Sequence, residues 1–185
     1  GLAEVVKTGW LAGGPLWRML ERRPDAILAR EPDALAEIVT RCIRYKAGVV
    51  GRDPKEGGER RVLNLGHTIG HGLEAAAGYG RWLHGEAVAA GLIGAARVAR
   101  RLGRTDWMAE LAFLLRFDQL EVLANIPSSP IDAGKTLEYI RRDKKRRDGR
   151  LAFVLPIAPG KVEIVEDVPM PVVRSVVKDL LASKD

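Results

Sequence analysis

The sequence predicts a mainly α-helical bundle with one small β-hairpin, and three observations support this fold class. Ala and Leu recur with helical periodicity through about the first two-thirds of the chain. Pro24, Pro32 and Gly103 stand between these periodic stretches, where helices are expected to stop. The stretch LAFVLPIAPGKVEIVEDV then differs in character, because it is rich in Val and Ile and has Pro159-Gly160 in its middle.

Each helix is predicted from a stretch in which apolar residues recur every three or four positions. We expect helices near residues 2–11, 15–22, 33–50, 59–77, 84–102, 106–116, 131–143 and, after the hairpin, 171–183. The two hairpin strands lie on either side of the turn at Pro159-Gly160. No internal repeat or low-complexity linker divides the chain, so residues 1–185 are predicted to form a single domain.

The composition argues against several classes of protein. The chain is 46% hydrophobic and 29% charged, and no stretch approaches the roughly 20 uninterrupted apolar residues of a membrane-spanning helix. The single cysteine, Cys42, cannot form an internal disulfide, and no leader-like segment is present, so we expect a cytoplasmic protein. The net charge of +6 suits an anionic ligand. Because helical sequence follows Gly1 at once, we expect a piece of a longer protein.

All three histidines of the chain fall between residues 67 and 84. On a helix over 60–77, polar residues fall within about 80° of arc, and apolar residues occupy the other side. The polar stripe consists of Arg60, Asn64, His67, His71 and Glu74, and the apolar face of Leu63, Leu65, Ile69 and Leu73. Gly66 and Gly70 lie beside each other and would permit a close helix neighbour. A solvated surface is the simpler interpretation, but such a surface more often carries Lys and Glu in bulk.

The histidines also predict a metal site. His67 and His71 are four residues apart, as in helical zinc sites, but the insert TIG lacks the glutamate that serves as base in metal-dependent hydrolases. His84 is a third candidate, at the start of an Ala- and Gly-rich helix that is expected to be buried. A catalytic zinc site takes three protein ligands, so two histidines and one carboxylate would suffice. Spacing alone does not choose among the candidate carboxylates, which are Glu4, Glu74 and Glu86.

Lysines supply the remaining candidates. In the predicted helix 33–50, Lys46 takes a central position in an apolar stripe formed by Leu35, Val39, Cys42 and Val49. Its ammonium either reaches water along its stem or points into a pocket at an anionic ligand. Glu4 and Lys7 lie three apart on one helix face, as in an ordinary i, i+3 ion pair.

The segment RRDKKRRDGR, residues 141–150, has seven basic residues in ten. A solvated face or loop is the usual explanation for such a run. It could bind nucleic acid, although no aromatic residues interleave it for base stacking. Alternatively, the end of the helix before the hairpin could supply one phosphate-binding lysine.

Taken together, these elements resemble a known family. The segments GLAEVVK, RYKAGVV, LNLGHTIGH, LHGEAV and DKK, the last followed by a glycine and FVLP, occur in that order. From Gly1 to about residue 160 they resemble the C-terminal domain of the 3-dehydroquinate synthases. The resemblance implies a two-domain enzyme whose N-terminal, Rossmann-like half binds NAD and whose helical half binds metal and substrate. No Gly-x-Gly-x-x-Gly fingerprint occurs here, so the NAD half is expected to be missing and the NAD-binding residues are unknown.

The resemblance also implies a role for individual residues. Glu4, His67 and His84 take the positions of the family's metal ligands. The implied substrate-binding and catalytic residues are Lys7, Lys46, Arg60, Asn64 and His71. Among these, Arg60 with Lys46 would bind the substrate carboxylate, and Asn64 and His71 would lie near its hydroxyl and phosphate groups. Lys144 or Lys145 would reach the phosphate.

The activity implied is cyclisation of 3-deoxy-D-arabino-heptulosonate 7-phosphate to 3-dehydroquinate with loss of phosphate, a lyase step of the shikimate pathway. It would require NAD and a divalent metal, zinc or cobalt, and family members are commonly homodimers. The chain alone, without the NAD half, is expected to be inactive. The nearest rival is a related sugar-phosphate cyclase, such as a 2-deoxy-scyllo-inosose or epi-valiolone synthase. Rivals of other classes are a basic helical nucleic-acid-binding module and a metal-dependent hydrolase.

Overall fold

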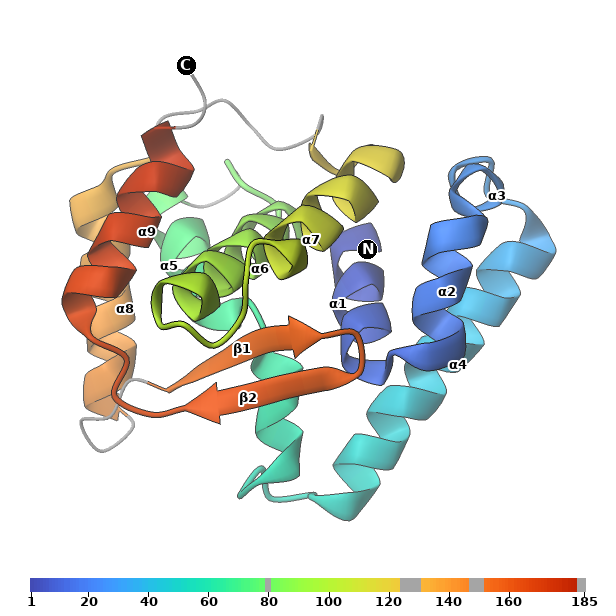
Figure 1. Ribbon diagram of the computed structural model, residues 1–185, viewed down its shortest axis with the longest axis horizontal. Coiled ribbons are helices and arrows are strands. Elements are labelled where there is room, and N and C mark those ends of the chain that lie inside the picture. The colour runs from blue at the N-terminus through green and yellow to red at the C-terminus, as the bar shows by residue number, and fades with distance from the viewer. Residues whose placement is uncertain (79–80, 124–130, 147–151, 183–185) are drawn as a thin grey trace.

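The protein folds as a helical bundle with a two-stranded antiparallel sheet on one side, as the sequence predicts (Figure 1). The computed structural model describes residues 1–78, 81–123, 131–146 and 152–182, without the side chains of 143–146. In chain order the elements are α1 (Leu2–Ala12), α2 (Gly14–Arg22), α3 (Pro24–Leu28), α4 (Pro32–Arg52), the 3₁₀ helix η1 (Glu59–Asn64), α5 (His67–Ala77), α6 (His84–Arg101), α7 (Met108–Gln119), α8 (Ala133–Arg146), β1 (Phe153–Ala158), β2 (Lys161–Val165) and α9 (Met170–Ala182).

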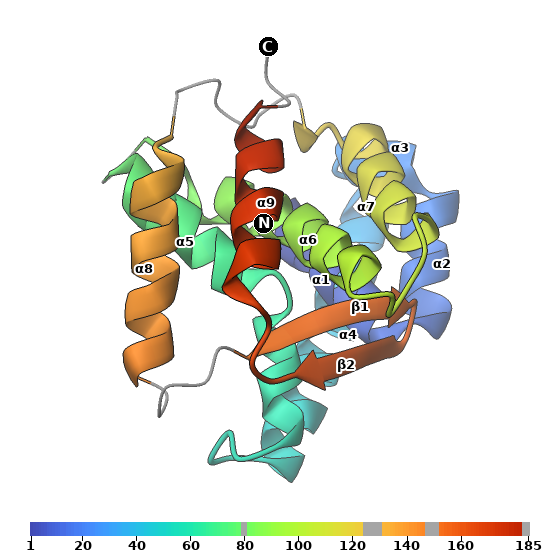
Figure 2. The same ribbon diagram turned by 60° about the vertical axis from the view of Figure 1, so that its left-hand side comes forward.

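Helix α6 is the central element of the bundle, because every residue from Ala87 to Ala96 is buried. On one side it packs against a core built on Trp10, Leu20 and Phe113 from α1, α2 and α7. On the other side, residues of α5, α8, α9 and β1 form a second core, and Figures 1 and 2 show these elements on that side of the bundle. The Ala- and Gly-rich sequence of α6 keeps it narrow enough for neighbours to approach on both sides.

Local sequence explains the helix ends that differ from prediction. Helix α7 begins at Met108 because the Asp106 carboxylate accepts the Met108 backbone N–H at 2.8 Å. Helix α8 likewise begins after Asp132, which accepts the Lys135 N–H at 2.8 Å. The short helix α3, with Pro24 at its start, was not predicted, because five residues carry too little periodicity.

The predicted single helix over 59–77 is wrong, because the chain breaks at Leu65 and Gly66 between η1 and α5. Gly66 has φ 78°, a left-handed conformation that glycine adopts without strain. A side chain there would also meet α6, since a Cβ atom would lie 2.8 Å from Leu92 Cγ. The polar stripe drawn on one continuous helix therefore does not exist as such. The expected close helix neighbour does, since a Cβ on Gly70 would lie 3.0 Å from the Ala87 carbonyl oxygen.

The apolar stripe predicted on α4 is confirmed only in part. The buried residues of this helix are Ala34, Ile38 and Val49, whereas Val39 is 51% exposed. Of the predicted stripe, Val49 is buried and Cys42 packs against the first core, but Val39 lies on a second, outer apolar face. Lys46 is exposed and does not lie within a continuous buried stripe.

Candidate metal centre and substrate cavity

Three potential metal ligands meet where three helices begin. Glu4 lies in the first turn of α1, while His67 and His84 open α5 and α6. One ligand atom from each residue lies within 4.8 Å of the other two. Glu4 Oε1 is 3.5 Å from His67 Nε2 and 3.9 Å from His84 Nε2. Residues separated by up to 80 positions in the chain thus share one small volume.

Each histidine is held at its other ring nitrogen. His67 Nδ1 lies 3.1 Å from the Leu65 carbonyl oxygen, and His84 Nδ1 lies 3.1 Å from Glu74 Oε2. Because both partners only accept hydrogen bonds, Nδ1 carries the proton in each neutral ring, and the Nε2 lone pair faces Glu4. Burial and the neighbouring Lys7 ammonium lower the pKa of His67 to about 4, so this ring is neutral at pH 7. Neutral imidazole is the form that binds metals.

The Glu4 carboxylate is shared between Lys7 and the histidines. Lys7 Nζ is 2.9 Å from Glu4 Oε2 and donates a second bond to the Leu63 carbonyl oxygen at 2.9 Å. Burial raises the pKa of Glu4, but the charge and hydrogen bond of Lys7, together with the two histidines, outweigh burial, and the pKa lies below its ordinary value. Lys7 is 5% exposed whereas the Glu4 side chain is 39% exposed, so the predicted ion pair is buried at its lysine end.

A cation fits the remaining oxygen of Glu4. Within the described part of the chain, Oε1 is buried and has no hydrogen-bond partner. A buried acceptor without a partner costs about 1–3 kcal/mol, and a cation there would remove that cost. One carboxylate oxygen and two imidazole nitrogens are a suitable donor set for zinc or cobalt.

The geometry separates the three carboxylates that spacing left open. Glu86 Oε2 accepts the Leu83 backbone N–H at 2.6 Å, which caps the start of α6. Glu74 binds His84 at the ring nitrogen remote from Glu4. Of the three, only Glu4 faces the Nε2 atoms of both histidines.

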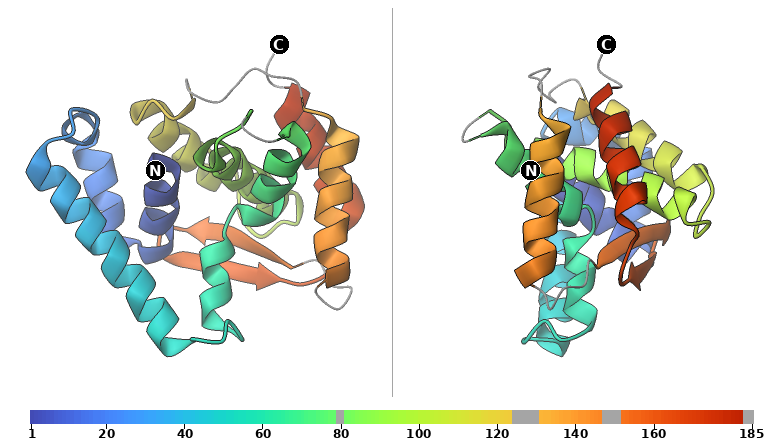
Figure 3. Two further views of the ribbon diagram at one scale, coloured as in Figure 1. Left: turned by 180° about the vertical axis from the view of Figure 1, so that it is seen from behind. Right: turned by 90° about the vertical axis from the view of Figure 1, so that its left-hand side faces the viewer.

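A cavity of about 300 Å³ opens beside this cluster. Seen from behind, α1 lies between α4 and the segment formed by η1 and α5, and these elements provide most of the cavity wall (Figure 3, left). The lining residues are Glu4, Lys7, Thr8, Lys46, Glu56, Arg60, Leu63, Asn64, His67 and His84. Most of the residues singled out from the sequence are therefore brought together, although Lys46 reaches the cavity from an exposed position.

His71 lies just outside this group. Its ring centroid is 5.1 Å from that of His67 and 6.0 Å from that of His84. It lines a neighbouring cavity of about 400 Å³ together with Thr68, Tyr139 and other residues of α5 and α8. His71 therefore connects the metal cluster with a second hollow on the α8 side.

The comparisons identify the family. Residues 1–146 match the model of the 3-dehydroquinate synthase C-terminal domain. The chain belongs to this family. Its predicted fold and family are thereby confirmed.

Solved structures of similar fold are sugar-phosphate cyclases. One is a 2-epi-5-epi-valiolone synthase from Streptomyces hygroscopicus subsp. jinggangensis 5008 with NAD⁺ and Zn²⁺ bound, at 20% identity and TM-score 0.81, covering 100% of this chain and 51% of that chain. Another is a 2-deoxy-scyllo-inosose synthase complexed with carbaglucose-6-phosphate, NAD⁺ and Co²⁺, at 25% identity and TM-score 0.81, covering 97% and 50%. A second structure of 2-deoxy-scyllo-inosose synthase has 24% identity and TM-score 0.77, covering 97% and 49%. The chain therefore spans about half the length of these proteins.

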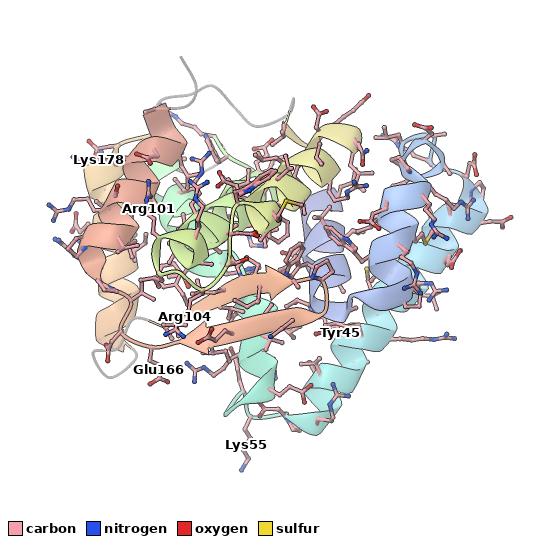
Figure 4. All side chains as sticks on the ribbon, in the orientation of Figure 1. Tyr45, Lys55, Arg101, Arg104, Glu166 and Lys178 are labelled. Carbon is pink, nitrogen blue, oxygen red and sulfur yellow. The ribbon has the colours of Figure 1, made fainter. Side chains whose placement is uncertain are left out.

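The loop between α4 and η1 contributes a residue that the sequence did not reveal. Glu56 lines the cavity, and its Oε1 accepts a hydrogen bond from Asn64 Nδ2 at 2.8 Å. Arg60 Nη1 donates to the Pro54 carbonyl oxygen at 2.9 Å. Lys55, at the tip of the same loop, points away from the protein (Figure 4). No spacing rule predicts which residue of such a loop turns inward.

Asp53 shapes this loop through its side-chain carboxylate. Its carboxylate accepts backbone N–H groups of Gly57, Gly58 and Arg60 at 3.0, 2.8 and 2.9 Å. The hydrogen bonds from Arg60 and Gly58 lower the pKa of Asp53 below its ordinary value of 3.8. The ionised form therefore stabilises the fold above pH 3.8, and this contribution is lost as the pH falls through the lowered pKa.

Replacing Asp53 by alanine should lower the melting temperature near pH 7, because three backbone donors lose their acceptor. The difference from the unsubstituted chain should shrink as the pH falls below 3.8, where the native carboxylate becomes protonated. Thermal unfolding of both proteins from pH 3 to 7 measures this difference in melting temperature. A difference that does not change with pH would contradict this role for the charge.

Two predictions fall on parts that the structure does not describe in full. Lys144 and Lys145 belong to the last turn of α8, but their side chains lie outside the described residues, and so does much of the basic run 141–150. Whether either lysine reaches a phosphate stays a prediction.

Among the described residues, no helix combines the length and apolar character needed to cross a membrane.

Proposed function

We propose that this chain is the metal- and substrate-binding half of a 3-dehydroquinate synthase, a carbon–oxygen lyase. The whole enzyme would convert 3-deoxy-D-arabino-heptulosonate 7-phosphate to 3-dehydroquinate and release phosphate. The observation that carries the proposal is the meeting of Glu4, His67 and His84 at the wall of a cavity. The same cavity presents the cations of Lys46 and Arg60, which suit a substrate with two anionic groups.

Two cofactors belong to the proposal. Glu4 Oε1 and the Nε2 atoms of His67 and His84 would hold the divalent cation, which, when bound, supplies positive charge that stabilises negative charge developing on a substrate oxygen. NAD⁺ would supply a hydride acceptor. Solved structures of similar fold contain NAD⁺ with Zn²⁺ or Co²⁺, which supports both assignments.

The chain's own residues would bind and orient the substrate. The planar guanidinium of Arg60 can bind a carboxylate through two parallel hydrogen bonds. Lys46 would add a second positive charge, and Lys7 would hold Glu4 in place through Oε2. With its Nδ2 bonded to Glu56, Asn64 offers its Oδ1 as an acceptor for a substrate hydroxyl. His71, on the α8 side, would contact the phosphate. Orientation and electrostatics would thus provide much of the catalysis.

The alternatives make different demands on the cavity. A 2-deoxy-scyllo-inosose or epi-valiolone synthase would act on a sugar phosphate without a carboxylate, and Arg60 would then lack its proposed partner. The nucleic-acid alternative depends on the run 141–150 and is not favoured by the family match. A homodimeric assembly and a cytoplasmic location stay predictions.

A substrate panel tests the proposal. The full-length enzyme with NAD⁺ and Zn²⁺ or Co²⁺ should release phosphate from 3-deoxy-D-arabino-heptulosonate 7-phosphate and not from glucose 6-phosphate, which has no carboxylate. Phosphate release is measured against a control without metal. Turnover only of sugar phosphates that lack a carboxylate would reassign the enzyme to the rival cyclases.

Replacing Arg60 by lysine should lower kcat/KM for the carboxylate substrate by about 10- to 100-fold, because a hydrogen bond to a charged group contributes about 1.5–3 kcal/mol. Arg61→Lys is the matched control, since Arg61 Nη1 lies 3.3 Å from Glu166 Oε1 and does not line the cavity. Steady-state kinetics of the full-length variants measure both. Equal losses in the two variants would show that Arg60 has no special role.

A further inference from the structure

The two histidines of the cluster are not held equally firmly. The His67 side chain is 14% exposed, and the backbone carbonyl of Leu65 binds its Nδ1. The His84 side chain is 48% exposed at the first position of α6. Burial therefore restrains the first ring far more than the second, and the ring of His84 needs a partner to keep one orientation.

Glu74 is placed to be that partner. It lies on α5 two turns after His67, so both side chains project from the same face of the helix. Its Oε2 atom is 3.1 Å from His84 Nδ1, and within the described residues this carboxylate makes no other hydrogen bond or ion pair. The contact also joins the end of α5 to the start of α6, which are the two helices that carry the histidines.

We propose that Glu74 is a positioning residue for the metal centre: its carboxylate accepts a hydrogen bond from the Nδ1–H of His84 and turns the Nε2 lone pair toward Glu4. The inference rests on the proposed metal site and adds a residue to it. A carboxylate that is hydrogen-bonded to the other ring nitrogen of a ligand histidine fixes the tautomer and the ring orientation. It also makes the metal-binding nitrogen more basic and therefore a stronger electron-pair donor to the metal. Without this acceptor, the exposed ring can rotate toward solvent or present the wrong nitrogen.

Direct ligation by Glu74 does not agree with the same geometry. Its Oε2 contacts the ring nitrogen on the far side from Nε2, and it is Nε2 that faces Glu4. A cation held between Glu4 and the two Nε2 atoms would lie across the imidazole from Glu74. The contact therefore suits an outer partner of the site and not one of its ligands.

Metal titration of the purified protein tests the proposal. Zn²⁺ affinity is measured by competition with a chelating indicator, and Co²⁺ coordination by its visible absorption spectrum. Glu74→Ala should weaken Zn²⁺ binding by about 10- to 100-fold. Glu74→Gln keeps an acceptor oxygen and should lose less Zn²⁺ affinity than Glu74→Ala. Glu37→Gln is the control, because its side chain is 41% exposed, close to the 39% of Glu74, and pairs with Arg41 on α4.

Further variants make the outcomes separable. If the unsubstituted protein and His84→Ala bind Zn²⁺ equally, the proposed metal site itself fails. If His84→Ala loses affinity while Glu74→Ala keeps it, only the role of Glu74 is overturned. If Glu74→Ala loses as much Zn²⁺ affinity as Glu4→Ala, Glu74 is itself a ligand, and the proposed positioning role is overturned. A purely structural role predicts a lower melting temperature of the metal-free protein with unchanged affinity and an unchanged Co²⁺ spectrum.

Discussion

His67→Ala should lower the affinity of the protein for Zn²⁺ or Co²⁺ by more than about 100-fold, because loss of a ligand costs more than loss of an outer partner, which costs about 10- to 100-fold. The effect should be this large because His67 is the best restrained of the three ligands. Its ring is only 14% exposed, neutral and fixed by the Leu65 carbonyl oxygen. No other described histidine can replace it, since His84 already faces the same oxygen of Glu4.

The adjacent histidine on α5 provides the control. His71 lies one turn further along the helix, with its ring centroid 5.1 Å from that of His67, but it is not among the three clustered ligands. His71→Ala should leave metal affinity within a few-fold of the unsubstituted protein. Isothermal titration calorimetry compares the two variants. If both lose metal equally, the ligand set has been drawn incorrectly.

Gly91→Ala should destabilise the fold by about 1–3 kcal/mol or more, the usual cost of inserting a group into a packed interior. A Cβ at this position would lie 2.0 Å from the Gly66 carbonyl oxygen and 2.8 Å from the Gly70 nitrogen. Both obstacles are backbone atoms, so α5 and α6 would have to move apart. Because these helices carry His67 and His84, metal affinity should fall together with stability.

Gly51→Ala is the matched control for this substitution. Gly51 also lies within a helix, α4, but nothing is within 4 Å of a Cβ built on it. Alanine there should be neutral or stabilise the protein by about 0.5–1 kcal/mol, because glycine loses more conformational freedom on folding. Urea denaturation measures both variants. Equal midpoints for Gly91→Ala and the unsubstituted protein would contradict the close packing of α5 and α6.

Local signals predicted most of the fold. Periodicity located the long helices, and Pro159-Gly160 located the turn of the hairpin. The break at Gly66 was missed because it depends on a tertiary contact. Leu92 of α6, which is distant in sequence, approaches Gly66 so closely that only a residue without a side chain fits there. The stripe predicted on α4 was only partly right, because the helix has a second apolar face at Val39 and Ile43, 51% and 62% exposed, that sequence periodicity does not distinguish from the buried one.

The candidate site was predictable to a different degree. Concentrated histidines and the need for a carboxylate indicated a metal centre, but spacing could not select the glutamate, and only family resemblance implied Glu4. Tertiary structure adds what spacing cannot supply, namely the distances from Glu4 Oε1 to the two histidines. Glu56 was not predicted at all, because its inward turn depends on the loop that Asp53 holds.

Crystals of the protein soaked in Zn²⁺ or Co²⁺ and measured at the absorption edge of the metal test the central claim most directly. The account predicts one strong anomalous peak in contact with Glu4 Oε1 and with Nε2 of both His67 and His84. A peak bound elsewhere, or no peak between these three atoms at a saturating metal concentration, would contradict it.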